Sequence, residues 1–149
     1  MSQAKPEYEP VTEFSSIATK LIQKYPELLD GINPNLISCV AVTNKEQKEG
    51  KSKFELKPVV YPFRLDCPFD YYLVINASVW ETLDEAHKAA LICDALCSVD
   101  REQPGKVVPF DLKAHAVMIR TLGPDFMDRG KIPNILTDNI DWKKEPQID

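Results

Sequence analysis

The spacing of hydrophobic residues along the chain predicts three helices. In residues 12–25 and 111–122, apolar side chains recur at intervals of three and four, which gives each helix one buried face. Residues 82–99 open with Thr82 and Glu85 at the spacing of a capping box, a signal for a helix start. The second half of this segment is apolar on most sides, so we expect it to be the central, buried helix.

Three shorter apolar runs predict β-strands, at residues 36–43, 54–64 and 70–77. Pro58 and Pro62 indicate that the second strand is either an edge strand or a broken one, because proline cannot donate a hydrogen bond to a neighbouring strand. The third run is the clearest strand and is apolar enough to be buried on at least one face. The expected fold is α+β: a small mixed or antiparallel sheet of three to four strands packed on about three helices.

The two ends of the chain lack these patterns. We expect residues 1–11 to be a flexible arm, residues 12–123 a single domain and residues 124–149 an extended tail. Apolar residues in the tail have no regular period, so it should lie over its own domain or over a partner, and the sequence favours neither. The tail's candidates for partner binding are Ile132, Ile135, Leu136, Ile140 and Trp142.

Residues 44–53 contain four Lys, two Glu and no apolar residue. This composition favours a solvated hairpin loop over a binding patch. If the loop does bind a partner, Lys48, Lys51 and Lys53 are the candidate contacts.

Composition excludes several classes of protein. The chain has 149 residues, 44% hydrophobic and 28% charged, as in an ordinary globular domain, and a net charge of −5 that gives no general affinity for nucleic acid or anionic membranes. No apolar run is long enough for a transmembrane helix, and the first residues lack the pattern of a signal peptide, so we expect a cytosolic protein. Its four cysteines should then be reduced, with Cys39 in the core and Cys67 in a turn, and none has the paired spacing of a structural zinc site.

Several segments, taken in order, resemble the phage-associated "putative metallopeptidase" family of small zincin-like proteins. They are DYYLVI at 70–75, Trp80, KAAL at 88–91, Phe110-Asp111-Leu112 and IRTLG at 119–123. The resemblance implies a zincin-like fold in which a helix carries His-Glu-x-x-His, with two zinc ligands and a general base.

This chain departs from that motif at the reactive positions. The first His of the family falls at Asp94, the general-base Glu at Ala95, the second His at Ser98, and the His of a later motif at Phe110. An alanine has no proton acceptor with which to activate water, so we expect the family's peptidase chemistry to be absent. On the downstream helix, the polar candidates for a third ligand are Asp111, Lys113 and His115.

A different metal site is one alternative. Cys93 and Cys97 lie four residues apart on one helix, and with His115 or Asp100 they could form a thiolate-rich site. Burial of both cysteines in the core is the favoured interpretation, because cysteine suits an apolar helix.

An acid–base or nucleophilic site is another alternative. His87 shares a face with Asp94 but lies about two turns away, roughly 10 Å along the axis, which is too far for a direct hydrogen bond between the two side chains. We therefore expect His87 to be an exposed residue of the first helical turns. Ser98 and His115 could form a triad with Asp94, yet a serine inside a helix lacks the sharp turn and oxyanion donors of such nucleophiles. A packed His115, satisfied by a backbone carbonyl or by Asp94, is favoured, and no phosphate-binding glycine motif occurs.

The sequence therefore favours a non-catalytic, phage-type protein with no cofactor that binds and modulates, most simply inhibits, a protein in the host cytoplasm. Candidate contact surfaces are the tail, the Lys-rich loop and the former cleft at His87, Asp94, Ser98 and His115. One alternative is a metal-dependent hydrolase with ligands among Cys93, Asp94, Cys97 and His115. The other is a phage assembly or structural component.

Overall fold

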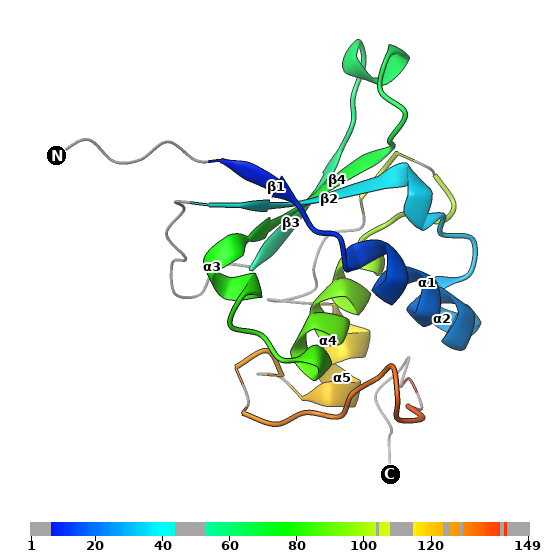
Figure 1. Cartoon of the computed structure of the whole chain (residues 1–149). Helices are drawn as coiled ribbons and strands as arrows, with labels where there is room; N and C mark the ends of the chain where they lie inside the picture. Colours follow the sequence, from blue (N-terminus) through cyan, green and yellow to red (C-terminus); the bar gives the residue numbers. More distant parts are fainter. Residues whose placement is uncertain are drawn as a thin grey trace, which may run out of the picture.

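A four-stranded mixed sheet organises the computed structural model, which describes residues 7–43, 53–103, 105–107, 115–123, 126–128, 130–140 and 142. The strand order is β1-β2-β4-β3 (Figure 1). The strands are β1 (Tyr8–Pro10), β2 (Ile37–Val42), β3 (Phe54–Pro58) and β4 (Tyr71–Asn76). β2 and β4 run parallel at the centre, and the two edge strands pair antiparallel with them.

Five α-helices occur among the described residues. They are α1 (Phe14–Lys24), α2 (Pro26–Leu29), α3 (Ala77–Trp80), α4 (Glu85–Leu96) and α5 (Ala116–Leu122), of which α2 and α3 are single turns of four residues. The expected α+β class and mixed sheet are thus confirmed, with two more short helices than the hydrophobic pattern indicates. Within the described part of the chain, no helix has the length and apolar character needed to cross a bilayer.

The core lies between one face of the sheet and the helices α1 and α4. Alternate strand residues point to this face, and the pairing register places them side by side: Cys39 and Leu56 both lie opposite Leu73. From Ala89 to Leu96 every residue of α4 is buried, which confirms that this is the central helix. From Ala89 onward α4 therefore has no solvent-exposed face.

The start of α4 differs from the expected capping box at Thr82. Asp84 is the N-cap, and its carboxylate accepts a hydrogen bond from the backbone N–H of His87 at 2.8 Å. Thr82 instead donates its hydroxyl hydrogen to the Val79 carbonyl at 2.7 Å, which closes the turn after α3. The added turn of α3 moves the start of the central helix toward the C-terminus.

His87 is buried, so its expected exposure was wrong. Its ring nitrogen Nδ1 lies 2.6 Å from the Asp84 carboxylate. The same carboxylate therefore caps the helix and pairs with the imidazole, which lets this polar ring enter the domain interior.

The strand boundaries also differ from the expectation in two places. Tyr8–Pro10 pairs with β2 as an edge strand, although these residues fall in the expected flexible arm. β3 ends at Pro58 rather than continuing to residue 64. Its position at a sheet edge agrees with the expectation from the prolines.

The C-terminal segment packs on the chain's own domain. Ile132, Ile135 and Trp142 are buried members of the core, and Leu136 and Ile140 pack against it. The Tyr25 hydroxyl donates to the carbonyl of Ile135, and its ring meets that of Trp142 edge-on at 5.4 Å between centroids. Of the two expected locations for the tail, the structure shows the one that completes the core, so these five residues do not form an exposed docking surface.

Candidate functional site

The three residues at the positions expected for the motif lie where the end of α4 meets the start of α5. Asp94 and Ala95 belong to the last turn of α4, and Ser98 follows the helix C-cap. His115 is the N-cap of α5 and faces them from the next element. All four side chains are buried, which makes this junction a polar cluster inside the core.

A hydrogen-bonded network connects Asp94, Ser98 and His115. The Ser98 hydroxyl oxygen lies 2.8 Å from Nε2 of His115. The backbone N–H of His115 donates to the Asp94 carboxylate at 3.1 Å. The structure confirms that His115 is packed; its ring meets Ser98, whereas Asp94 binds its backbone. These contacts hold α5 against α4, and they are the reason why polar side chains are tolerated there.

Asp94 has an unusual environment for a carboxyl group. Burial raises its pKa from 3.8 to about 7, and the hydrogen bond from the backbone of His115 only partly opposes this change. The desolvation of the charged form outweighs the single hydrogen bond. A neutral carboxyl group is therefore substantially populated near neutral pH.

The residues at the motif positions do not match the donors that zinc requires. Zinc in peptidases takes three ligands from His, Cys, Asp or Glu. Asp94 and His115 are of these types, but Ser98 is not. Within the described residues, no group of three such side chains lies close enough to hold a metal ion. Ala95 is fully buried and has no group that could activate water.

The two cysteines of α4 have different surroundings. Cys93 is completely buried, and the hydrogen bond with Cys97, together with burial, raises its pKa well above the usual value of a thiol. Cys97 is half-buried at the helix end. The structure thus agrees with core packing for Cys93, whereas the Cys97 side chain reaches a cleft.

This cleft has a volume of about 680 Å³ and lies beside the polar cluster. Cys97 and His115 contribute to its wall, as do Arg101 and Arg120. Its lining is completed by Leu28, Ile32, Leu96, Val99, Asp100, Glu102 and Val117. The mixture of both charges with apolar groups gives the cleft no single preferred ligand.

Several residues singled out from the sequence lie outside the described part of the chain: Lys48, Lys51, Phe110, Asp111 and Lys113. Lys53 is described, and its ammonium group pairs with the carboxylate of Asp128 at 2.7 Å.

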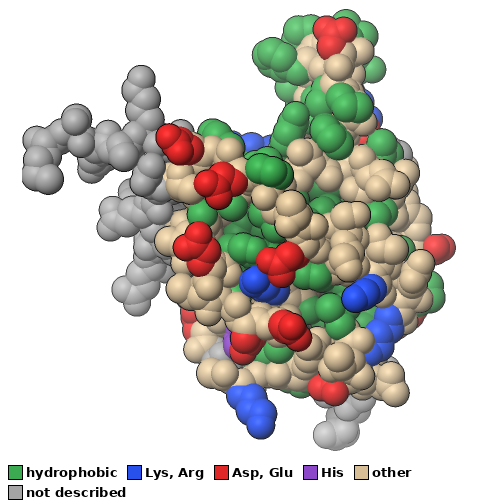
Figure 2. Space-filling model, in the orientation of Figure 1, with side chains coloured by type: hydrophobic (Ala, Val, Ile, Leu, Met, Phe, Trp, Pro, Cys, Tyr) green, Lys and Arg blue, Asp and Glu red, His purple; other side chains and the backbone are tan. Residues whose placement is uncertain are grey.

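The sequence pattern did not identify the most exposed apolar segment of the structure. Residues 59–70 join β3 to β4 and project from the body of the protein as an apolar protrusion (Figures 1 and 2). We call this segment the hairpin tip. Among the described residues seven large hydrophobic side chains are exposed, and four belong to the tip: Val60, Tyr61, Phe63 and Leu65.

A signal for the hairpin tip exists in the sequence. Its apolar residues lie between Pro58 and Pro68, with neither the alternation of a strand nor the spacing of a helix. The strand expected at residues 54–64 includes most of these apolar residues, whereas β3 ends at Pro58 and most of them are exposed.

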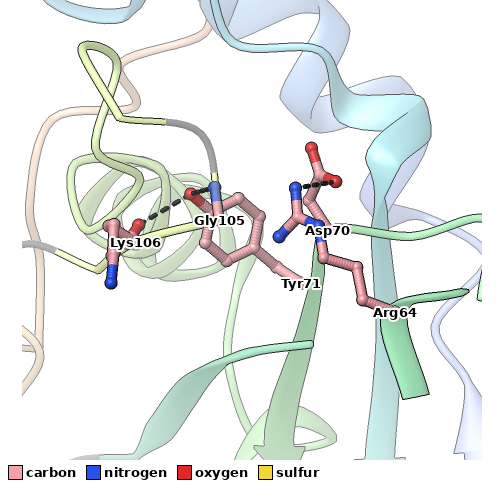
Figure 3. A network of polar contacts seen from close by, with 5 residues as sticks. All are labelled: Arg64, Asp70, Tyr71, Gly105 and Lys106. Atoms are coloured by element: carbon pink, nitrogen blue, oxygen red, sulfur yellow. Dashed lines mark hydrogen bonds and ion pairs between the residues drawn. The ribbon is translucent and has the colours of Figure 1, made fainter. Parts of the chain in front are cut away.

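Polar contacts close the base of the hairpin tip and join the strand that follows it, β4, to Gly105 and Lys106 (Figure 3). The Arg64 guanidinium pairs with Asp70 at 2.9 Å. Next along the chain, the Tyr71 hydroxyl accepts a hydrogen bond from the Gly105 N–H and donates to the Lys106 carbonyl. Gly105 has a φ of +87°, which favours glycine, and a Cβ atom there would displace the guanidinium end of the Arg64 side chain.

Comparison with known proteins gives one family. Neither the curated proteins nor the solved structures yielded a match. A family model described as "Putative phage metallopeptidase" matches residues 6–140, which include the whole sheet, α4, α5 and most of the C-terminal segment. The chain therefore belongs to this family of phage metallopeptidase-like proteins.

Proposed function

We propose that this chain is a non-catalytic member of its family that acts by binding a host protein in the bacterial cytoplasm and inhibiting it. One observation carries the first part of the proposal. The three reactive positions of the family motif hold Asp94, Ala95 and Ser98, and the two polar residues among them are engaged in a buried structural network.

The chemistry of these positions supports a binding role over peptide hydrolysis. A metallopeptidase needs a base that removes a proton from water, and Ala95 offers none. Ser98 directs its hydroxyl at the His115 ring, so both groups serve to join two helices. The scaffold retains its central helix and sheet, which leaves its surface as the means of action. The projecting hairpin tip provides such a surface.

Zinc binding and hydrolysis test the proposal directly. The untagged full-length protein is incubated with zinc, dialysed and analysed for bound metal, and it is then assayed on casein with and without added zinc. We expect no stoichiometric zinc and no zinc-dependent cleavage. Stoichiometric zinc that is lost in both Asp94→Asn and His115→Ala, together with casein cleavage, would overturn the non-catalytic assignment.

A variant that restores the motif provides a matched control. Asp94→His, Ala95→Glu and Ser98→His together recreate His-Glu-x-x-His on α4, where the two histidines would lie one turn apart on one face. If α4 is the family's metal-binding helix, this triple variant should bind zinc where the natural chain does not. Circular dichroism checks that the variant retains its helices.

The alternative is a metal-dependent hydrolase with unconventional ligands. Its specific support is that Cys97 and His115 both line the cleft of about 680 Å³. The same measurement separates the two functions, because such an enzyme would lose its zinc in Cys97→Ser, whereas a binding protein would be unaffected by that change.

A further inference from the structure

We propose that the hairpin tip is the surface by which this protein docks, and that it fits a concave apolar pocket with a Lys or Arg at its rim on a partner protein. This inference rests on the proposed binding function and deepens it by naming the surface and the chemistry of the partner.

The first step is the concentration of exposed apolar side chains. Tyr61, Phe63 and Leu65 are each more than 70% exposed. They are close neighbours in a segment that projects from the body, and hydrophobic side chains cover much of this protrusion on the face that Figure 2 shows. Contiguous exposed apolar surface on a protein marks an interaction site, and aromatic residues contribute most to binding at such sites.

The second step is that the patch is held in shape before any partner arrives. Residues Phe63–Leu65 form a 3-10 helix, and the N–H groups of Asp66 and Cys67 donate to the carbonyl of Phe63. At the base, Val59 donates its N–H to the carbonyl of Asp70 at 2.9 Å. A patch ordered in advance loses little conformational entropy on docking, which favours specific binding.

The third step is charge. Arg64 is neutralised within the hairpin tip by Asp70. Asp66 is exposed and forms no ion pair with any of the described residues. The tip therefore presents an apolar centre beside one unpaired negative charge, and a complementary surface carries a cation at the rim of an apolar pocket.

Two other occupants agree less well with these features. A membrane interface usually attracts basic residues beside the aromatic ones, yet the free charge of the tip is Asp66 and the chain has a net charge of −5. In a second copy, one receptor available to the tip is the cleft beside His115. That cleft is lined by Asp100, Arg101 and Glu102, which match an apolar protrusion poorly.

Photo-crosslinking in cells of the phage's host bacterium tests the surface. The photoreactive amino acid p-benzoylphenylalanine replaces Phe63 in one variant of the full chain and Tyr8 in another. Tyr8 is a matched control because it is also an exposed aromatic residue, 65% accessible, but it lies on β1. We expect an ultraviolet-dependent adduct from position 63 alone, mapped by mass spectrometry to an apolar pocket with a Lys or Arg at its rim.

Affinity measurements on the identified partner then test the chemistry. Phe63→Ser should raise the dissociation constant about thirtyfold or more, because the loss of an aromatic side chain at the centre of an interface has an effect of this size. Asp66→Asn should raise the dissociation constant a few fold and make it less dependent on salt concentration. Tyr8→Ser should leave the dissociation constant unchanged. Equal affinity for Phe63→Ser and the natural chain would refute the docking surface.

The remaining outcomes are also decisive. An adduct at position 63 only with another copy of the chain, or flotation of the purified protein with phosphatidylcholine vesicles, would overturn the partner assigned here. A protein adduct at position 8 without one at position 63 would refute the hairpin tip but leave the binding function intact. Zinc-dependent cleavage of casein would instead refute the proposed function itself.

Discussion

The Ser98 hydroxyl oxygen lies 2.8 Å from Nε2 of His115, across the junction of α4 and α5. Both side chains are buried, so water cannot replace either partner. The contact joins two helices that are separate in the sequence. Ser98, which stands where the sequence comparison expects the second histidine of the motif, thus has a structural task, and its removal should affect stability.

Replacing this hydroxyl group tests the structural task. Ser98→Ala should lower the free energy of unfolding by about 1–3 kcal/mol, the usual effect of leaving a buried polar group without one of its partners. Ser15→Ala is the control, since Ser15 is exposed on α1 and its loss should change stability by less than about 0.5 kcal/mol. Urea unfolding measures both values, and equal stabilities would contradict the structural assignment.

Asp94 should make stability depend on pH. Its pKa is about 7 in the folded chain and 3.8 without burial, so between about pH 4 and 7 the folded state holds a proton that the unfolded state has lost. The free energy of unfolding must then fall as pH rises through this range, by up to about 4 kcal/mol, with no further loss above it. Asp94→Asn removes this dependence and should be more stable than the natural protein at pH 8.

Urea unfolding of both proteins at pH 5, 6, 7 and 8 measures this difference. The stability of the natural protein relative to Asp94→Asn should fall steadily from pH 5 to pH 7 and change little from pH 7 to pH 8. If their stabilities stay parallel over the whole range, Asp94 is ionised throughout, and the assigned effect of burial is wrong.

The sequence predicts those parts of the fold whose hydrophobic pattern fits only one kind of secondary structure. α4 was recognised because its apolar residues surround the helix, and β4 because its apolar run is short and bounded by a turn. His87 was placed on the surface because spacing alone does not reveal that Asp84 bonds its ring and allows its burial. Such pairings depend on the exact start of a helix, which patterns locate poorly.

Of the two functional regions, the sequence predicts the residues of the polar cluster but not the exposed hairpin tip. The motif points to Asp94 and Ser98, and His115 is a polar candidate on the downstream helix; the structure brings the three together. The hairpin tip was missed because its apolar residues were counted toward a strand. Exposure is a property of the whole fold, and a local apolar run does not show whether another element covers it.

The C-terminal segment should contribute strongly to stability. Ile135 is fully buried in the core, so Ile135→Ala should lower the free energy of unfolding by about 2–5 kcal/mol. Trp142 provides a contrast, because its ring nitrogen is buried and has no hydrogen-bond partner among the residues that the structure describes. Trp142→Phe removes that unsatisfied group and should offset much of the lost packing.

Thermal unfolding of the two variants is the measurement. The Tm should fall by many degrees in Ile135→Ala and only slightly in Trp142→Phe. Little change in Ile135→Ala would mean that the segment detaches from the domain in solution and could reach a partner.

Gly105 should be intolerant of a side chain for two separable reasons. Its φ of +87° disfavours any residue with a Cβ atom, and that atom would collide with the Arg64 guanidinium. We expect Gly105→Ala to destabilise the protein by roughly 1 kcal/mol through its backbone conformation, with a smaller additional loss because the displaced Arg64 guanidinium gives up its ion pair with Asp70. In an Arg64→Ala background the collision disappears, so the same change should have a smaller effect. Additive effects in this double-mutant cycle would show that the two residues are not in contact.

Thiol reactivity should divide the four cysteines into two pairs. Cys39 is buried, which raises its pKa to about 12, and Cys93 is buried beside Cys97, which also raises its pKa. Cys67 and Cys97 are half-buried, the first in the hairpin tip and the second at the cleft. Because the thiolate is the reactive form and must be reached by the reagent, a disulfide reagent should modify Cys67 and Cys97 quickly and the other two only after unfolding.

Counting fast-reacting thiols in the native protein at neutral pH checks this division. Cys67→Ser and Cys97→Ser should each remove one fast thiol, and the double variant should leave none. Fast modification of Cys93 would mean that the packing around α4 opens readily, and the motif positions on that helix would then be accessible to solvent and to metal ions. Slow modification of Cys93 in the double variant supports a closed helix, in which Asp94 and Ser98 serve the fold.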